Sequence, residues 1–141
     1  MRTHNALYGG EMSAHHYFRD FMYCDSGMIP WLKVVESMSI TGKPLSALVG
    51  EMQANYPSSG EINYTVENAD AVIEAVRAKY APDALDVDTL DGLSLSFADW
   101  RINLRKSNTE PLLRLNIEAR GNRALVDQRV AEFEALIASF Q

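Results

Sequence analysis

The sequence predicts an α+β protein: a four-stranded antiparallel sheet with two helices on one face, preceded by a helical segment that belongs to a second domain. Three observations lead to this prediction. Four short segments alternate between apolar and polar residues, two longer segments carry apolar residues at helical spacing, and a turn-rich stretch separates them from the N-terminal part. Alternation is typical of strands that bury one face, and two helices are enough to cover that face.

The four predicted strands lie in the second half of the chain. Their apolar positions are Ile62, Tyr64 and Val66; Leu93, Leu95 and Phe97; Trp100, Ile102 and Leu104; and Leu113, Leu115 and Ile117. The intervening residues are polar, so the opposite face of the sheet is expected to be solvated. On the third and fourth strands this polar face carries Arg101, Asn103, Arg105, Arg114 and Asn116.

Two helices are predicted between and after these strands. Asn68 is the expected N-cap of the first, and Gly121 with Asn122 opens the second, because asparagine is favoured at helix N-caps. Each helix has one apolar stripe, which we expect to pack on the apolar face of the sheet. The stripes consist of Ala69, Val72, Ile73, Val76 and Tyr80, and of Leu125, Val126, Val130, Phe133, Leu136, Ile137 and Phe140.

Two further helices are predicted near the N-terminus. The first, capped by Ser26, covers about residues 28–38, and the second covers about residues 44–55. The first helix is apolar on nearly every side, so it is expected to need a partner surface. Residues 56–60, with the sequence YPSSG, are typical of a linker.

The linker divides the chain of 141 residues into two expected domains, residues 1–56 and 57–141.

The net charge of −6 disfavours nucleic acid and membrane surfaces as partners. No apolar run is long enough to span a bilayer and no signal-peptide pattern is present, so a cytoplasmic location is expected. Cys24 is the single cysteine, which leaves no internal disulfide and no cysteine-built zinc site.

The segment RKSNTEPLLR, residues 105–114, is the strongest candidate for an anion site. Arg105 and Lys106 precede three short hydrogen-bonding side chains, and a proline then fixes where the chain returns to a strand. Phosphate needs several donors converging on its oxygens, and such a turn can supply them. The interval 101–123 holds six cations and two acids, which suits a small anionic ligand. The alternative is an ordinary β-turn, because SNTEP is common in turns.

Residues 8–23 combine glycines, a carboxylate, a serine, two histidines and aromatic residues without a clear period, which predicts a loop. An extended backbone would project Glu11 and Ser13 to one side, where they can bind the vicinal hydroxyls of a sugar, and His15 follows on that side. A metal site at His15 and His16 is disfavoured, because adjacent side chains point apart and no third ligand is evident. A purely structural loop closed by aromatic side chains is the alternative.

Together, these two stretches resemble the C-terminal part of an α-D-phosphohexomutase, and most closely the bacterial phosphomannomutases. GEMSAH at residues 10–15 is similar to the family's sugar-binding loop, and RKSNTEP at residues 105–111 to its distal phosphate-binding loop, in the same order and at about the same spacing. The resemblance implies that Glu11 and Ser13 contact sugar hydroxyls. It places His15 near the reacting oxygen and leaves a general acid/base role open. The phosphate far from the reacting phosphoserine would be held by Arg105, Ser107, Asn108 and Thr109.

The chain departs from the family in what it lacks. The family's phosphoserine loop, T-x-S-H-N-P, and its magnesium loop, D-G-D-x-D, are both absent. Asp86, Asp88 and Asp91 have a superficially similar spacing, but Asp91 and Gly92 are predicted to form a hairpin turn before a strand. No metal site is therefore predicted here, and magnesium is implied only for the full-length enzyme. The chain is expected to be a fragment with the end of the sugar-binding domain and the whole phosphate-binding domain.

Two single residues bear on the family branch. The methionine at position 12 resembles the residue found in the mannose/glucose branch of the family, and Ala14 stands where a glycine is commoner in the family.

The resemblance implies part of an isomerase of carbohydrate metabolism that interconverts mannose 6-phosphate and mannose 1-phosphate through a bisphosphorylated intermediate, in nucleotide-sugar supply. This chain alone is expected to be inactive, because it lacks the phosphoryl donor and the metal. A stand-alone phosphosugar-binding module without catalysis is the alternative. A nucleic-acid-binding domain is suggested only by the sheet with two helices, and the net charge opposes it. The helix near Trp31 is expected to be poorly ordered or to drive self-association.

Overall fold

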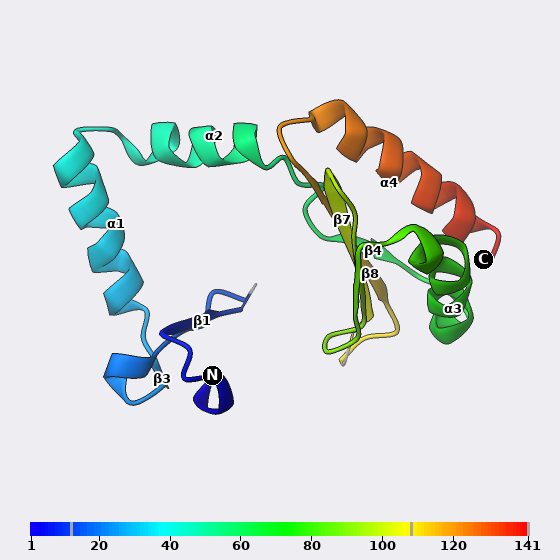
Figure 1. Ribbon diagram of the computed structural model, residues 1–141, viewed down its shortest axis with the longest axis horizontal. Helices are drawn as coiled ribbons and strands as arrows, with labels where there is room; N and C mark the ends of the chain where they lie inside the picture. Colours follow the sequence, from blue (N-terminus) through cyan, green and yellow to red (C-terminus); the bar gives the residue numbers. More distant parts are fainter. Residues whose placement is uncertain (12, 108, 141) are drawn as a thin grey trace. The chain divides into compact units, whose positions relative to one another are not determined.

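The computed structural model describes residues 1–11, 13–107 and 109–140. Figure 1 shows the chain, which forms two compact units, Met1–Val49 and Gly50–Gln141. Helix α2, Leu45–Asn55, contains the division between them. The sequence places the domain boundary at residues 56 and 57, a few residues further along the chain.

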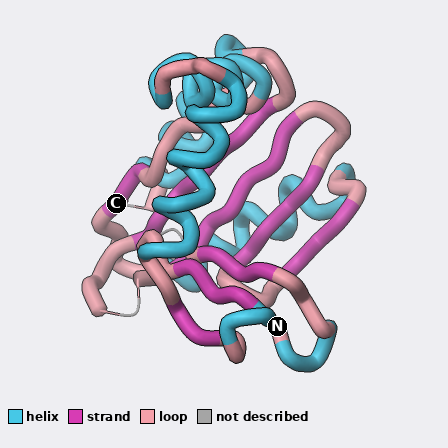
Figure 2. Tube along the Cα trace, turned by 90° about the vertical axis from the view of Figure 1, so that its left-hand side faces the viewer, coloured by secondary structure: helices cyan, strands magenta, loops and turns pink. Residues whose placement is uncertain are grey.

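The C-terminal unit is built on an antiparallel sheet of five strands in the order β4-β8-β7-β6-β5, which lie side by side in Figure 2. The strands are β4 (Ile62–Tyr64), β5 (Asp86–Asp88), β6 (Leu93–Ser96), β7 (Trp100–Lys106) and β8 (Leu113–Ala119). The α+β class is confirmed, and the prediction of four strands is wrong. The missed strand, β5, is a short edge strand whose residues are all exposed, so it carries no apolar alternation. Its two aspartates suit an edge, because charge discourages pairing with other strands.

Two helices cover one face of this sheet, α3 (Ala69–Tyr80) and α4 (Arg123–Ala138) (Figure 1). The side-chain oxygen of Asn68 accepts from the amide of Ala71 at 3.0 Å, and that of Asn122 accepts from Leu125 at 3.0 Å, so both predicted caps form. The core lies between sheet and helices. Its buried side chains include Val72, Val76, Tyr80, Leu93, Leu95, Ile102, Leu104, Leu113, Leu115, Ile117, Ala119, Val126, Phe133 and Ile137.

The predicted linker is attached to the edge of the sheet beside β8. The amide of Ser59 donates to the carbonyl of Ile117 at 2.8 Å, and the amide of Ala119 donates to the carbonyl of Pro57 at 3.0 Å. Further along the same edge, the amide of Gly121 donates to the carbonyl of Asn55 at 2.7 Å. Residues 55–59 therefore continue the sheet and are not a free linker.

The N-terminal unit begins with a small antiparallel sheet in the order β1-β2-β3. Its strands are β1 (Tyr8–Gly10), β2 (His16–Phe18) and β3 (Cys24–Asp25), and short 3-10 turns occupy Arg2–His4 and Arg19–Phe21; a third such turn, Ala81–Asp83, follows α3 in the C-terminal unit. The prediction of a loop over residues 8–23 is therefore wrong. Strands of two or three residues with exposed or half-buried side chains show no period that a sequence reading can detect.

Helix α1 covers Met28–Thr41, three residues beyond its predicted end. The N-cap is Gly27 and not Ser26 as predicted, although the hydroxyl of Ser26 accepts from the amide of Ile29 at 3.3 Å. Every residue of this helix is described and none is buried. Within the described residues, no helix combines the length and hydropathy needed to cross a membrane.

Candidate functional site

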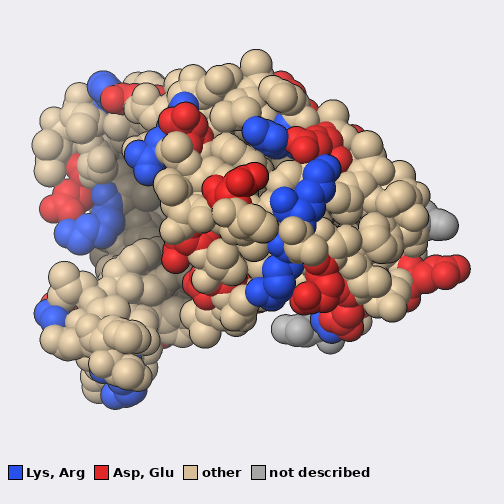
Figure 3. All heavy atoms as spheres, turned by 45° about the vertical axis from the view of Figure 1, so that its right-hand side comes forward, with Lys and Arg blue, Asp and Glu red and all other residues tan. Residues whose placement is uncertain are grey.

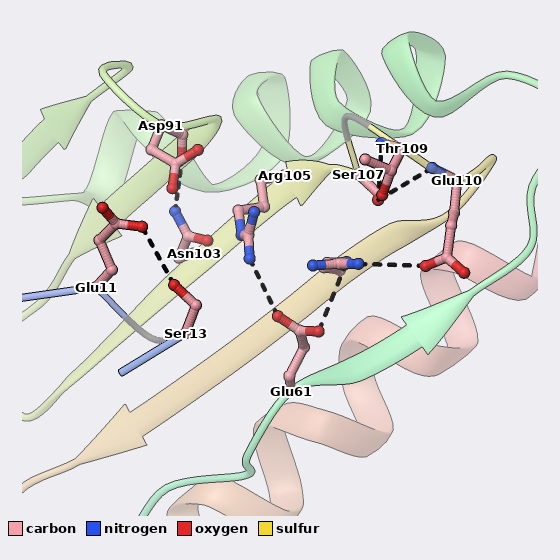
Figure 4. A network of polar contacts seen from close by, with 10 residues as sticks. Glu11, Ser13, Glu61, Asp91, Asn103, Arg105, Ser107, Thr109 and Glu110 are labelled. Carbon is pink, nitrogen blue, oxygen red and sulfur yellow. Dashed lines mark hydrogen bonds and ion pairs between the residues drawn. The ribbon is translucent and has the colours of Figure 1, made fainter. Parts of the chain in front are cut away.

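The polar face of the sheet places two arginines opposite one another. β7 and β8 pair with Arg105 directly across from Arg114, and Glu61 contacts both arginines; Figure 4 shows its contact with Arg105. The Nη2 atom of Arg105 donates to Oε2 of Glu61 at 3.2 Å, and Nε of Arg114 lies 3.6 Å from Oε1 of Glu61. The three side chains are only 20%, 22% and 23% exposed for Arg105, Arg114 and Glu61. Glu61 thus offsets the repulsion that two like charges on adjacent strands would otherwise experience.

Arg114 also connects this face to the candidate phosphate loop. Its Nη2 atom donates to Oε2 of Glu110 at 3.4 Å. Its Nε atom is buried and has no hydrogen-bond partner among the described residues, so the ion pair with Glu61 is its electrostatic compensation. Arg114 is therefore held between two carboxylates.

The loop between β7 and β8 is closed by its own backbone and by Ser107. The amide of Ser107 donates to the carbonyl of Leu112 at 2.8 Å. The hydroxyl of Ser107 accepts from the amides of Thr109 and Glu110 at 3.4 and 3.3 Å, and it lies 3.5 Å from the Thr109 hydroxyl. Asn108, the remaining predicted phosphate contact, lies outside the described residues. Figure 4 shows Ser107 and Thr109 together in the loop, and Arg105 on the adjoining strand with its side chain directed at Glu61.

Lys106 does not join Arg105, although both were predicted to present cations at this loop. Successive residues of a strand point to opposite faces, and Lys106 lies on the helix side. Its Nζ atom contacts the carboxylate oxygens of Asp70 at 2.8 and 3.1 Å, in the first turn of α3. Lys106 and Ser107 line a cavity of about 290 Å³ near the start of this helix. On the polar face, Arg114 lies opposite Arg105, where the alternation of the two strands had placed both arginines.

The turn before β6 supports the backbone of Arg105. The side-chain amide of Asn103 donates to the carbonyl of Asp91 at 2.8 Å and to the hydroxyl of Ser94 at 2.9 Å. Gly92 has φ of 76°, and a Cβ at this position would lie 2.5 Å from Cβ of Arg105. The predicted turn at Asp91 and Gly92 is present, and it packs closely against the strand that carries Arg105. The described residues contain no group of three or more histidine, cysteine, aspartate or glutamate side chains that could hold a metal ion.

Ion pairs, both local and between distant residues, compensate much of the positive charge that the interval 101–123 shows in the sequence. Besides Arg105 and Arg114, the guanidinium of Arg123 lies 2.9 Å from Asp127 on α4. On the face of the molecule shown in Figure 3, lysine and arginine side chains likewise lie next to aspartate and glutamate side chains. On this face, neighbouring acids therefore offset part of the positive charge.

The candidate sugar loop connects β1 and β2. The amide of Glu11 donates to the carbonyl of His15 at 2.9 Å, which closes the loop. Oε2 of Glu11 accepts from the Ser13 hydroxyl at 3.2 Å, and Oε1 accepts from the Tyr17 hydroxyl at 2.7 Å. The hydrogen bond from Tyr17, followed by that from Ser13, lowers the pKa of Glu11. Glu11 and Ser13 are brought together, as predicted, but by a turn and not by an extended backbone.

Ala14 adopts φ of 65° within this loop. This left-handed conformation favours glycine, which explains why a glycine is the natural choice at that position.

His15 is held by an acidic partner that the sequence did not indicate. Its Nδ1 atom lies 2.7 Å from Oδ2 of Asp25, whose other oxygen accepts from the amide of His16 at 2.9 Å. The hydrogen bond and the negative charge of Asp25 raise the pKa of His15, and the same hydrogen bond lowers the pKa of Asp25. Only the pairing of β2 with β3 brings Asp25 near His15, so no local spacing could have identified it.

The comparisons with known proteins bear on the family of the chain. The family model described as the phosphoglucomutase/phosphomannomutase C-terminal domain matches residues 61–136, and the model of the α/β/α domain III matches residues 1–56. The chain belongs to the phosphoglucomutase/phosphomannomutase family. The resemblance stated from the two loops is thereby confirmed.

Individual members of the phosphoglucomutase/phosphomannomutase family match over nearly the whole chain. A phosphomannomutase of Salmonella montevideo is 56% identical over 139 residues, and one of Escherichia coli is 53% identical over 137 residues. These matches cover 99% and 97% of the chain but 30% of each relative, so the chain spans less than a third of the length of these relatives. A solved phosphoglucomutase/phosphomannomutase family protein from Burkholderia thailandensis is 29% identical, with a TM-score of 0.71 over 98% of this chain and 29% of that one.

Proposed function

We propose that this chain binds a phosphorylated hexose and serves a phosphomannomutase that interconverts mannose 6-phosphate and mannose 1-phosphate. The observation that carries the proposal is the position of Arg105, on a polar face at the end of β7 and beside the loop of Ser107 and Thr109. A guanidinium next to short donors suits a phosphate group. The names of relatives that are 53–56% identical support phosphomannomutase chemistry for the enzyme.

In this proposal, the two loops divide the work of holding the substrate. Glu11 and Ser13 bind sugar hydroxyls, and the lowered pKa of Glu11 keeps its carboxylate ionised as an acceptor. The phosphate that does not react is held by Arg105, Ser107, Asn108 and Thr109. Binding energy at this remote phosphate orients the reacting end of the sugar, which is where positioning contributes to the rate.

His15 is proposed to move a proton near the reacting oxygen. Asp25 fixes Nδ1 of the imidazole at 2.7 Å, so the second ring nitrogen is the one left for the substrate. A histidine whose pKa is raised by a neighbouring carboxylate holds its proton closer to neutral pH, which suits a general acid.

The described residues do not fit a magnesium site, because they contain no suitable group of ligands. We therefore assign the metal and the phosphoserine to other domains of the enzyme, and binding and orientation of the sugar to this chain. The chain alone is expected to show no mutase turnover. Such an enzyme would act in the cytoplasm and supply a sugar phosphate for nucleotide-sugar synthesis.

Binding to the 141-residue chain tests the proposal directly. NMR chemical-shift titrations with mannose 6-phosphate and with inorganic phosphate should shift resonances of Arg105, Ser107 and Thr109. Arg105→Ala should weaken binding about tenfold to a hundredfold, the value of a charge-assisted hydrogen bond. Arg77→Ala is the matched control, since Arg77 lies on α3 and pairs with Glu74 at 3.2 Å. Equal weakening by both substitutions, or shifts confined to other regions, would contradict the proposal.

A further inference from the structure

The carboxylate of Glu61 lies between the two arginines of the polar face and contacts both. We propose that Glu61 is a positioning residue of the phosphate site: it holds the guanidinium of Arg105 ready for phosphate and allows Arg114 to lie beside it. This inference rests on the proposed function of Arg105. It adds a residue that lies outside both loops, 44 positions before Arg105 in the sequence.

A β-bulge at the edge of the sheet aims Glu61 at the arginines. Ser58 forms a bridge with Glu118, whereas Ile62 pairs with Leu115. Two residues, Gly60 and Glu61, therefore lie opposite a single residue of β8. Gly60 has φ of 68°, the left-handed conformation expected for the first residue of this type of bulge. Because the extra residue shifts the alternation, Ser58 and Glu61 both face the polar side.

The contacts leave Arg105 able to bind an anion while Glu61 holds it. Glu61 accepts from one terminal nitrogen of Arg105, and a guanidinium has five N–H donors in a fixed plane. Among the described residues, Glu61 is the one recorded partner of the Arg105 side chain, so the remaining donors can face phosphate. Since the side chains of Arg105 and Glu61 are only 20% and 23% exposed, solvent screens their interaction less than it would at an open surface.

A carboxylate near an anion site can also weaken anion binding, because its negative charge repels the anion. If Glu61 acted only through its negative charge, its removal would strengthen phosphate binding. If it positions Arg105, its removal weakens binding although the site becomes more positive. The sign of the change therefore separates the two roles.

The test uses the 141-residue chain and NMR titration with inorganic phosphate and mannose 6-phosphate at fixed ionic strength. Glu61→Ala should weaken binding about five- to tenfold, within the range of couplings between contacting charged residues. Glu61→Gln keeps an acceptor oxygen at the same reach and should restore most of the affinity. Glu61→Asp keeps the charge but loses reach, so it should weaken binding even if the alanine variant does not fold.

Two controls make the result specific. Asp70→Ala removes another acid that pairs with a cation next to the loop, Lys106, without touching Arg105, and it should not weaken binding. In an Arg105→Ala background, Glu61→Ala should have little further effect, because Glu61 acts through Arg105.

The outcomes separate the inference from the proposed function. If Arg105→Ala weakens binding while Glu61→Ala and Glu61→Asp leave it unchanged or strengthen it, the positioning role is wrong and the proposed function stands. Additive losses in the double variant would also contradict a role through Arg105. If Arg105→Ala has no effect on binding, the proposed function fails and the role of Glu61 fails with it.

Discussion

At the scale of single residues, the charge of His15 depends on one hydrogen bond. Asp25 contacts its Nδ1 atom at 2.7 Å and stabilises the protonated imidazole. A histidine with a raised pKa in the folded state contributes stability below its unfolded pKa, and that contribution is lost as the pH rises through the folded pKa. The pair should therefore stabilise the N-terminal unit in mildly acidic solution and not in basic solution.

Asp25→Asn should lower the pKa of His15 towards about 6.5, the ordinary histidine value, because the amide carries no charge. NMR titration of the His15 ring protons measures this change. The difference in thermal stability between the two proteins should be larger at about pH 6 than at about pH 9. Asp20→Asn is the control, because Asp20 pairs with Arg19. An unchanged His15 titration in Asp25→Asn would show that the hydrogen bond does not set its charge.

Residue types and their order identified the two loops but not the partners of the residues within them. Arg105 and Ser107 were recognisable because a short segment concentrates cations and hydroxyls. Glu61 and Asp25 were not, because each reaches its partner only through the pairing of strands. Alternation along β7 separates Lys106 from Arg105, since adjacent residues of a strand face opposite sides. The pairing of Lys106 with Asp70 was not foreseen, because it joins residues that are far apart in the sequence.

At the scale of elements, burial decides which parts of the fold the sequence could predict. β6 and β8 bury every residue of one face, β7 buries Ile102 and Leu104, and the alternation of the three strands located them. β5 and the strands of the N-terminal sheet bury no side chain, so they carry no such pattern. The helices α3 and α4 were predicted with their caps because both the apolar stripe and the asparagine are local signals.

The turn between β5 and β6 should be intolerant of any side chain at Gly92. Gly92→Ala would place a Cβ 2.6 Å from the carbonyl oxygen of Leu104 and 2.5 Å from Cβ of Arg105. We expect a loss of about 2 kcal/mol or more in the free energy of unfolding, from the left-handed backbone and the clash together. Weaker phosphate binding should accompany it, because the clash displaces the backbone of Arg105.

Gly121→Ala is the matched control for this turn. Gly121 also has a positive φ, 59°, but a Cβ there would meet no atom within 4 Å. Gly121→Ala should lower the free energy of unfolding by about 1 kcal/mol, the cost of a left-handed backbone at a non-glycine residue, and leave phosphate binding unchanged. Chemical denaturation measures both variants. Equal losses of unfolding free energy in Gly92→Ala and Gly121→Ala would mean that the contact of Gly92 with Arg105 adds nothing to the cost of the positive φ.

At the scale of the whole molecule, helix α1 presents apolar side chains to solvent. Trp31 is 57% exposed and Leu32 is 53% exposed, and Met28, Val35 and Ile40 are also exposed. Exposed apolar surface of this kind is typical of a face that contacts another protein surface. The sequence anticipated this exposure, because the helix is apolar on nearly every side.

We expect the 141-residue chain to self-associate through this helix. Sedimentation velocity should show a mass that increases with concentration, and replacing Trp31 and Leu32 by glutamate should reduce the association. Leu90→Ser is the control, since Leu90 is 92% exposed but lies in the turn before β6. A monomer at every concentration, with a Trp31 fluorescence maximum typical of a buried indole, would contradict the prediction.

The pairing of residues 55–59 with β8 has a consequence for how the C-terminal unit opens. The amides of Ser59, Ala119 and Gly121 are enclosed in hydrogen bonds of 2.7 to 3.0 Å along the edge of the sheet. Their hydrogens should therefore exchange with solvent deuterium slowly and together with those of β8, as one cooperative unit. By its amide exchange, the sheet should therefore begin at Asn55. A protease that needs an unfolded substrate should cleave between Asn55 and Gly60 only after the whole edge of the sheet has opened.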